Sequence, residues 1–254
     1  MSANIFTHHV DSPYSVSRHR SGTFYGQSPD EALTTLRDAI RRPGAARTVA
    51  SRSYNAIIGR FPSHKMRIGF AAESHVELQA FLLADVLERV LYFNAQPVQV
   101  RYLHKGQIRM AYPDIAVETT DGKLEMWECK ADSKMRKEAI ERHVSLYQAL
   151  REIGISYRIM QPTSLGQEPR AANAEMIWRQ ADRLIPSDLQ DSVLQCVRSG
   201  GETLGEIRDA LNCSMASLLA LVGQGKLAVN IHAAPLTSAS FVRAALPLAT
   251  AGGF

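Results

Sequence analysis

Two apolar runs joined by a short turn signal constrain the fold of this chain more than any other feature. They cover residues 115–117 and 126–127, and Thr120-Asp121-Gly122 lies between them. A three-residue loop that ends in glycine suits a β-hairpin, because its last position needs a positive φ. A hairpin centred on the middle residue of this loop sets Asp114 opposite Glu128.

Charged side chains stand at the open end of this predicted hairpin. Side chains alternate faces along a strand, so Glu128 and Lys130 project from one face together with Asp114. Ile115 and Val117 lie on the opposite face, which we expect to be apolar. A bulge would shift the register by one residue. Each charged residue could also be an ordinary solvated position, so the prediction rests on their combination.

Two carboxylates beside a lysine are suited to metal-dependent hydrolysis of a phosphodiester. The carboxylates hold a divalent cation, and the lysine steers the attacking water and offsets phosphate charge. Mg²⁺ is the expected ion because hard cations prefer oxygen ligands, and we expect Mn²⁺ to substitute for it.

The composition is that of a globular protein. The 254 residues are 45% hydrophobic and 21% charged, which suffices for one large domain or two smaller ones. The three cysteines lack CxxC spacing, which argues against a zinc site and a disulfide framework and favours a reducing cytoplasm. The sequence shows no signal peptide and no apolar run of about 18 residues, so we expect no membrane span.

The basic charge is concentrated near the N-terminus. Residues 1–67 carry nine Arg and one Lys against four acids, a net charge of +6, which leaves −2 for the rest of the chain. Arg binds phosphate with a planar fork, so a DNA-facing segment is one interpretation and a solvated surface is the other. The candidate DNA contacts, here and after the hairpin, are Arg60, Lys65, Lys134, Arg136 and Lys137.

The remaining pattern predicts an α/β sandwich around a mixed sheet. Ser28-Pro29 begins a helix that ends near residue 42, and a second helix covers about 72–90. Strands are expected near 90–92, 97–103 and 108–110, and again at 155–160. A long helix at about 134–153 precedes that last strand and ends at Gly154. Its predicted apolar stripe consists of Ile140, Val144, Tyr147 and Leu150.

The C-terminal third has a different character. Residues 162–170 resemble a linker, and helices are expected near 171–184, 187–198, 202–211 and 214–223, followed by a strand at 225–231. The three short helices and the strand make a winged-helix pattern. The third of these helices lacks Arg, Lys and Asn, which favours docking of a protein over reading of bases, although both remain open.

Five short motifs together resemble the PD-(D/E)XK core of TnsA-type transposon endonucleases, over roughly residues 60–160. They are Ser63-His64-Lys65, the acidic helix start with Glu73 and Glu77, the Gln96-Pro97 step, Pro113-Asp114, and Glu128-Cys129-Lys130. The resemblance implies a restriction-endonuclease-like fold followed by a winged-helix-like domain. It suggests a basic segment at 1–67, a nuclease core at 68–165 and a C-terminal domain at 166–254.

The resemblance also implies roles for individual residues. Glu77 matches the helix glutamate of the family, with Glu73 as its competitor, and Asp114 matches the metal aspartate. Glu128 stands where the family may carry Gln, and Lys130 matches the catalytic lysine. The implied catalytic set is Glu77, Asp114, Glu128 and Lys130, and the implied metal ligands are Glu77, Asp114, Glu128 and the Cys129 carbonyl.

The partners implied by the resemblance are double-stranded DNA at transposon ends, a TnsB-like recombinase subunit and a TnsC-like AAA+ regulator. The expected activity is cleavage at the 5′ ends of a transposon during excision. Two alternatives remain: a stand-alone restriction- or repair-type endonuclease of the same core, and a non-catalytic winged-helix DNA-binding protein.

Overall fold

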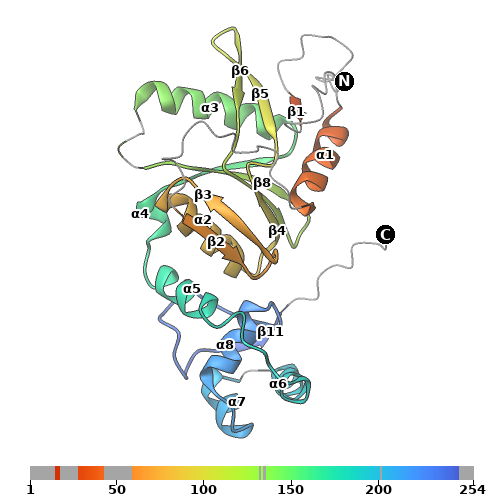
Figure 1. Ribbon diagram of the computed structural model, residues 1–254, viewed down its shortest axis with the longest axis vertical. Helices are drawn as coiled ribbons and strands as arrows, with labels where there is room; N and C mark the ends of the chain where they lie inside the picture. Colours follow the sequence, from red (N-terminus) through yellow and green to blue (C-terminus); the bar gives the residue numbers. More distant parts are fainter. Residues whose placement is uncertain are drawn as a thin grey trace. The chain divides into compact units, whose positions relative to one another are not determined.

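A computed structural model describes residues 15–17, 28–42, 59–131, 133, 136–200 and 202–245 (Figure 1). The chain divides into two compact units that are discontinuous in sequence. The first unit holds the described residues up to Arg60 together with Ala71–Glu77 and Leu91–Pro162. The second holds Phe61–Phe70, Leu78–Val90 and the described residues from Thr163 onward. The three-segment division suggested by the sequence stays a prediction.

Strands predominate in the described chain up to β9, and helices predominate after it. In chain order they are β1 (Ser15–Ser17), α1 (Pro29–Arg41), β2 (Gly59–Ser63), β3 (Ile68–Ala72), α2 (His75–Val86), β4 (Val90–Ala95), β5 (Gln99–His104), β6 (Gln107–Ala111), β7 (Ile115–Thr119), β8 (Leu124–Cys129), α3 (Lys137–Glu152), β9 (Ser156–Met160), α4 (Pro162–Leu165), α5 (Arg170–Trp178), α6 (Ser187–Ser199), α7 (Leu204–Ala210), α8 (Met215–Gly223), β10 (Leu227–Val229) and β11 (Val242–Ala244).

A mixed four-stranded sheet in the order β4-β7-β8-β9 forms the centre of the first unit. Strands β7 and β8 are antiparallel, whereas β8 and β9 are parallel and are connected through α3. A parallel pair needs such a crossover. A second sheet, in the order β1-β5-β6, belongs to the same unit. The expectation of a mixed sheet flanked by helices is confirmed.

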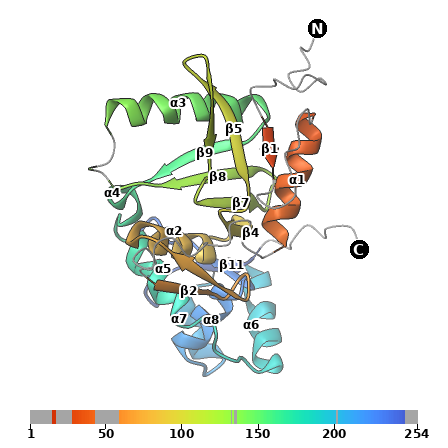
Figure 2. The same cartoon turned by 45° about the horizontal axis from the view of Figure 1, so that its top comes forward.

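The core of this unit lies between one face of the sheet and the helices α1 and α3 (Figure 2). Leu36 and Ile40 enter it from α1, Met126 from β8, and Leu146 and Leu150 from α3. Tyr102 and Val100 of β5 complete it. The sheet therefore holds α3 and β5 close to the strands that carry the charged residues.

Helix α1 begins as the sequence predicts. Ser28 is its N-cap, and the Ser28 hydroxyl accepts a hydrogen bond from the Glu31 N–H while the Glu31 carboxylate accepts one from the Ser28 N–H. This reciprocal pairing is a capping box. At the other end, the Asn94 side chain donates to the Ala39 carbonyl at 2.8 Å and fixes the helix to β4.

The region before α2 differs from its prediction. Residues 59–63 and 68–72 form the paired strands β2 and β3, although the sequence pattern predicts no strand there. Helix α2 begins only at His75, because the Ser74 hydroxyl accepts the Glu77 N–H at 3.1 Å and caps the helix there. The predicted start at residue 72 is therefore wrong.

The apolar stripe predicted for α3 is also largely wrong. Leu150 is buried, but Ile140, Val144 and Tyr147 are 45%, 49% and 43% exposed. The buried side of α3 instead carries Leu146, Ala149 and Leu150. The helix has two apolar sides, and the small Ala149 lets one of them approach the sheet closely. Gly154, with φ 78°, ends the helix as expected.

The C-terminal part of the second unit contains α5 to α8 and the antiparallel pair β10–β11. Helix α8 begins after its predicted N-cap Ser214 and buries Leu218–Val222 almost completely. The Asn173 side chain of α5 donates to the Ile231 and Ala234 carbonyls and accepts the Leu236 N–H. Nowhere in the described part of the chain does a helix combine the length and apolar character needed to cross a bilayer.

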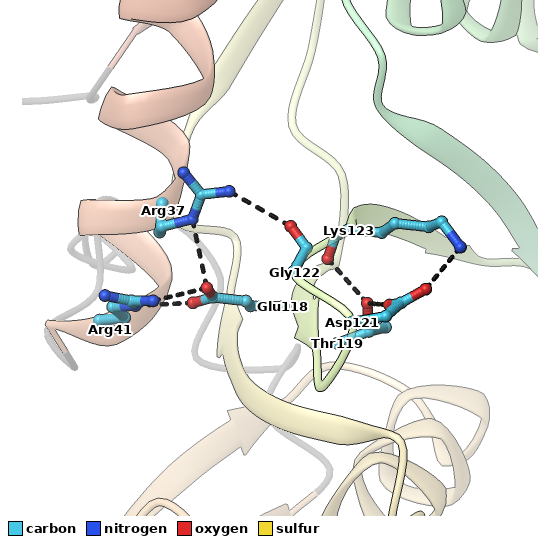
Figure 3. A network of polar contacts seen from close by, with 7 residues as sticks. All are labelled: Arg37, Arg41, Glu118, Thr119, Asp121, Gly122 and Lys123. Atoms are coloured by element: carbon cyan, nitrogen blue, oxygen red, sulfur yellow. Dashed lines mark hydrogen bonds and ion pairs between the residues drawn. The ribbon is translucent and has the colours of Figure 1, made fainter. Parts of the chain in front are cut away.

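A buried carboxylate connects α1 to the hairpin (Figure 3). Glu118 of β7 accepts hydrogen bonds from Arg41 at 2.6 and 2.7 Å and from the Arg37 Nε at 3.2 Å. Arg37 also donates to the Gly122 carbonyl in the turn. The side chain of Glu118 is 3% exposed, so its charge depends on these two guanidinium groups.

We expect Glu118→Gln to lower the free energy of unfolding by about 2 kcal/mol, because it leaves two partly buried guanidinium groups without their shared anion. Chemical denaturation measures this change. The matched control is Lys123→Gln, which removes an exposed ion pair to Asp121 on the same hairpin and should leave the stability nearly unchanged. Equal losses in the two variants would contradict the assigned role of Glu118.

Candidate active site

The hairpin register predicted from the turn is confirmed. Gly122 has φ 78° and its N–H donates to the Thr119 carbonyl at 2.9 Å, while the Thr119 N–H donates to the Lys123 carbonyl. Ile115 pairs with Trp127. The same register, continued by one residue, places Asp114 opposite Glu128. The turn therefore places the two acids side by side although fourteen positions separate them in sequence.

Backbone groups hold Asp114 in place. Its Oδ2 accepts the Cys129 N–H at 2.7 Å across the hairpin. Its carbonyl accepts the N–H of Gln96 at 2.9 Å. Gln96 has a positive φ of 41°, a backbone conformation that is uncommon for a residue other than glycine. The Gln96-Pro97 step thus ends β4 with a turn that fixes the backbone of Asp114.

Lys130 lies directly against the second carboxylate. Its Nζ is 2.6 Å from Glu128 Oε1, and the two side chains are 30% and 13% exposed. Burial alone would lower the pKa of Lys130, but the Glu128 carboxylate more than offsets this and the net pKa shift is upward. Lys130 is therefore a protonated ammonium at neutral pH.

The two acids share this single cation. Burial, followed by the charge of Glu128, raises the pKa of Asp114 to about 7. Burial also raises the pKa of Glu128, although Lys130 acts in the opposite direction. Glu125 and Glu118 on the same hairpin are instead bound by arginines, with Arg158 donating to both oxygens of Glu125. Only the pair Asp114–Glu128 has more negative charge than the adjacent side chains neutralise.

Glu77 lies near this pair but is turned toward its own helix. Its charge raises the pKa of Asp114 and of Glu128. Its two carboxylate oxygens accept hydrogen bonds from the Glu73 N–H and the Ser74 hydroxyl. Glu73 precedes α2, so only Glu77 of the two competing acids lies on the helix. Of the two, the structure brings Glu77 into electrostatic reach of the other acids.

The prediction of one polar and one apolar face needs correction. Ile115 and Val117 are buried as expected, but Ala116 and Met126, on the face of Asp114 and Glu128, are buried in the core as well. Both faces are covered because helices pack on this sheet, and the charged residues occupy only its end. The opposite face also holds the buried Glu125, which accepts a hydrogen bond from the Trp127 indole at 2.9 Å.

Two residues that the sequence interpretation missed lie beside the site. Tyr157 of β9 pairs with Met126, so it shares a sheet face with Glu128. The charges of Glu128 and Asp114 add to burial in raising the pKa of Tyr157. Its hydroxyl lies 2.8 Å from Nδ1 of His143, on α3. Strand alternation places Tyr157 correctly, but no sequence signal shows that α3 turns His143 toward it.

The predicted DNA contacts are scattered over different elements. Arg60 lies on β2, and the exposed Arg136 and Lys137 lie at the start of α3. For these three residues DNA contact stays a prediction. Lys134 lies outside the described residues.

Lys65 has a structural position in the second unit. Its Nζ donates to the carbonyls of Ala84, Leu87 and Val90 at 2.7 to 2.9 Å, which engages all three ammonium hydrogens. Burial lowers its pKa to about 7. An ammonium that caps the end of α2 has no hydrogen left for a phosphate, so the predicted DNA contact of Lys65 is not supported by its geometry.

The donor set suits a hard cation with few protein ligands. Among the described residues, no three His, Cys, Asp or Glu side chains are grouped closely enough to hold a metal by themselves. Mg²⁺ is commonly held by one or two carboxylates and completes its shell with water and substrate phosphate oxygens. Asp114 and Glu128, with an excess of negative charge, fit that requirement.

Comparison with known proteins adds no assignment, because no known family model and no curated protein matches this chain.

The raised pKa of Asp114 has a consequence for stability. Because its pKa is higher in the folded protein than in the unfolded chain, the folded state binds more protons between about pH 4 and pH 7, and stability falls as the pH rises through this range. In metal-free buffer at pH 8, Asp114→Asn should raise the free energy of unfolding by on the order of 2 kcal/mol, and at pH 4 it should change it little. Urea titrations at the two pH values measure this. A variant less stable than wild type at pH 8 would contradict the burial of an under-neutralised carboxylate.

Lys65→Met should lower the free energy of unfolding by on the order of 2–3 kcal/mol, because it leaves the backbone carbonyls of Ala84, Leu87 and Val90 without their donor. Lys137→Met, at an exposed position, is the matched control and should be nearly neutral. Thermal and denaturant unfolding would compare them. A Lys65→Met protein with unchanged stability would show that these hydrogen bonds make no net contribution to the free energy of unfolding.

Proposed function

We propose that this protein is a Mg²⁺-dependent DNA endonuclease that acts as the TnsA-like subunit of a heteromeric transposase and cuts the 5′ ends of a transposon. One observation carries the hydrolytic part of the proposal. Two partly buried acids, Asp114 and Glu128, face each other across a hairpin and share one lysine, whereas the neighbouring buried acids Glu118 and Glu125 are paired with arginines. This charge imbalance favours a divalent cation.

The acidic residues of the site would hold the metal ion. Asp114, Glu128 and the Cys129 carbonyl would hold Mg²⁺, which when bound polarises the phosphate and lowers the pKa of a bound water. Backbone hydrogen bonds to Asp114 keep that carboxylate oriented before substrate arrives. Glu77 would bind a second ion or orient a water after rotating away from its helix-capping bonds.

Lys130 acts on the substrate rather than on the metal. It is protonated, and its ammonium lies 2.6 Å from a carboxylate that the cation would also attract. With Glu128 holding the cation, the Lys130 ammonium would be free to turn toward the scissile phosphate. There it positions the attacking water and stabilises negative charge that grows in the transition state. The products would be a 5′-phosphate and a 3′-hydroxyl.

The architecture supports the same family. An antiparallel hairpin that carries the acids, followed by a helix and a parallel strand, agrees with the restriction-endonuclease-like fold. The order α6, α7, α8, β10, β11, with a bridge between Thr203 and Phe241, agrees with a winged helix. Because α8 buries most of its apolar residues and carries no basic residue, docking of a protein suits this domain better than base reading. Its partner would be the TnsB-like recombinase or the TnsC-like regulator.

The test is cleavage of duplex DNA carrying transposon ends, with Mg²⁺ or Mn²⁺, in the presence and absence of the partner proteins. Wild type should cut at the 5′ ends only when the partners are present, and Asp114→Ala or Lys130→Ala should reduce cutting at least about a thousandfold. Glu73→Gln is the matched control and should retain activity.

Two results would change this assignment. Wild-type rates in Lys130→Ala would overturn the hydrolytic site. Partner-independent cutting at defined sequences would instead identify a stand-alone nuclease.

A further inference from the structure

The β5–β6 hairpin is the most exposed and most basic strand pair in the described part of the first unit. Residues 91–113 contain Arg101, Lys105 and Arg109 and no acidic residue. From Lys105 to Met110 every side chain is exposed. In both views the tip of the hairpin extends past α3 (Figures 1 and 2).

The tip of the hairpin is tied to α3. Lys105 Nζ lies 2.6 Å from Glu141 Oε2, and His104 Nδ1 lies 2.9 Å from the Ser145 hydroxyl. Its turn, Lys105-Gly106, has positive φ at both residues, which gives a tight two-residue connection. The β5–β6 hairpin is thus a two-stranded ribbon whose tip is held against α3.

This ribbon lies beside the proposed active site. Its inward-facing Tyr102 is buried in the same core as Met126 of β8, two residues before Glu128. Helix α3, which holds the hairpin tip, also carries His143 against Tyr157 on the strand next to Glu128. The charges of Glu128, Arg109 and Arg142 all act on the Tyr102 hydroxyl. A polymer that reaches Asp114 and Glu128 from this side would therefore meet the hairpin.

The outward face of the ribbon carries apolar side chains, while Lys105 lies at the turn and the exposed Arg109 lies on the other face, paired with Tyr102. Leu103 pairs with Ile108, and Met110 lies on the same face, with 40%, 44% and 63% exposure. Strand β6 is also the edge of its sheet among the described residues. A second copy of the chain would bring two such basic ribbons together and be repelled. A polyanion is attracted, and a two-stranded β-ribbon fits a groove of duplex DNA.

We propose that the β5–β6 hairpin is a DNA-binding ribbon that places a duplex on the site of Asp114 and Glu128. Lys105 and Arg109 contact phosphates, and Ile108 and Met110 make apolar contacts inside the groove, as Ile and Met do in other groove binders. The exposed Lys105–Glu141 pair is weak enough for a phosphate to compete with it. This inference rests on the proposed function, because it names how that substrate is held.

The test measures binding of the full chain to a duplex by fluorescence anisotropy in EDTA, as a function of salt. The charge variant Lys105→Gln/Arg109→Gln should weaken binding about tenfold or more and reduce the slope of log K against log salt by about 2. The apolar variant Ile108→Ser/Met110→Ser should weaken binding about fivefold or more with an unchanged slope, because it loses no phosphate contact. Lys123→Gln/Arg151→Gln removes two exposed charges from the same unit and should bind like wild type.

Arg109→Lys should keep the salt slope, since it retains the charge, and unchanged thermal melting would show that each variant is folded. Binding by both hairpin variants that equals wild type would overturn the inference, and the surface would then suit an acidic protein. In that case metal-dependent cutting by the wild type would leave the proposed function standing. Hairpin-dependent binding without any cutting in the presence of metal and partners would overturn the proposed function and leave the ribbon standing.

Discussion

The register of the β7–β8 hairpin is the constraint on which the candidate site depends. A shift of one residue would send either Asp114 or Glu128 to the other face of the sheet. Three features fix it: the left-handed backbone of Gly122, the Thr119–Lys123 hydrogen bond, and the Arg37 contact to the Gly122 carbonyl from α1. The turn thus has a functional role although it lies at the opposite end of the hairpin from the acids.

The hairpin carries two kinds of acid, one fully buried and one partly buried. Glu118 and Glu125 have arginine partners with two or more hydrogen bonds, so their charges are matched and contribute to the structure. Asp114 and Glu128 share one lysine and one backbone N–H. The second pair reduces stability in the absence of a ligand, which is a common property of sites arranged for binding rather than for folding. The difference between the two kinds is a physical criterion that needs no family assignment.

The sequence was sufficient where one local rule decided the structure. The turn glycine, the Ser28 capping box and the Gly154 stop each predict their elements correctly. Prediction from the sequence failed where two local arrangements were equally suitable and tertiary packing selected one of them. Helix α3 has apolar residues on two sides, and only the tertiary contact with the sheet selects Leu146 and Leu150 over Val144 and Tyr147. The sequence suggests that Lys65 is a surface cation, but in the structure its ammonium donates hydrogen bonds to three backbone carbonyls.

In the candidate site, too, local rules predict some positions and tertiary packing decides the others. Strand alternation predicts that Asp114, Glu128 and Lys130 share a face, because that depends on two neighbouring strands only. The arrival of Tyr157 and His143 depends on the crossover through α3, and the orientation of Glu77 depends on the Ser74 cap. The crossover has no period or spacing that a sequence alone would reveal, whereas Ser74 and Glu77, three residues apart, have the spacing of a capping box.

The most direct measurement is anomalous diffraction from crystals of the protein soaked in Mn²⁺. The account predicts a Mn²⁺ peak coordinated by carboxylate oxygens of both Asp114 and Glu128, with the Lys130 ammonium displaced from Glu128. Crystals at saturating Mn²⁺ that show no peak between these two residues, with the Lys130–Glu128 ion pair intact, would contradict it.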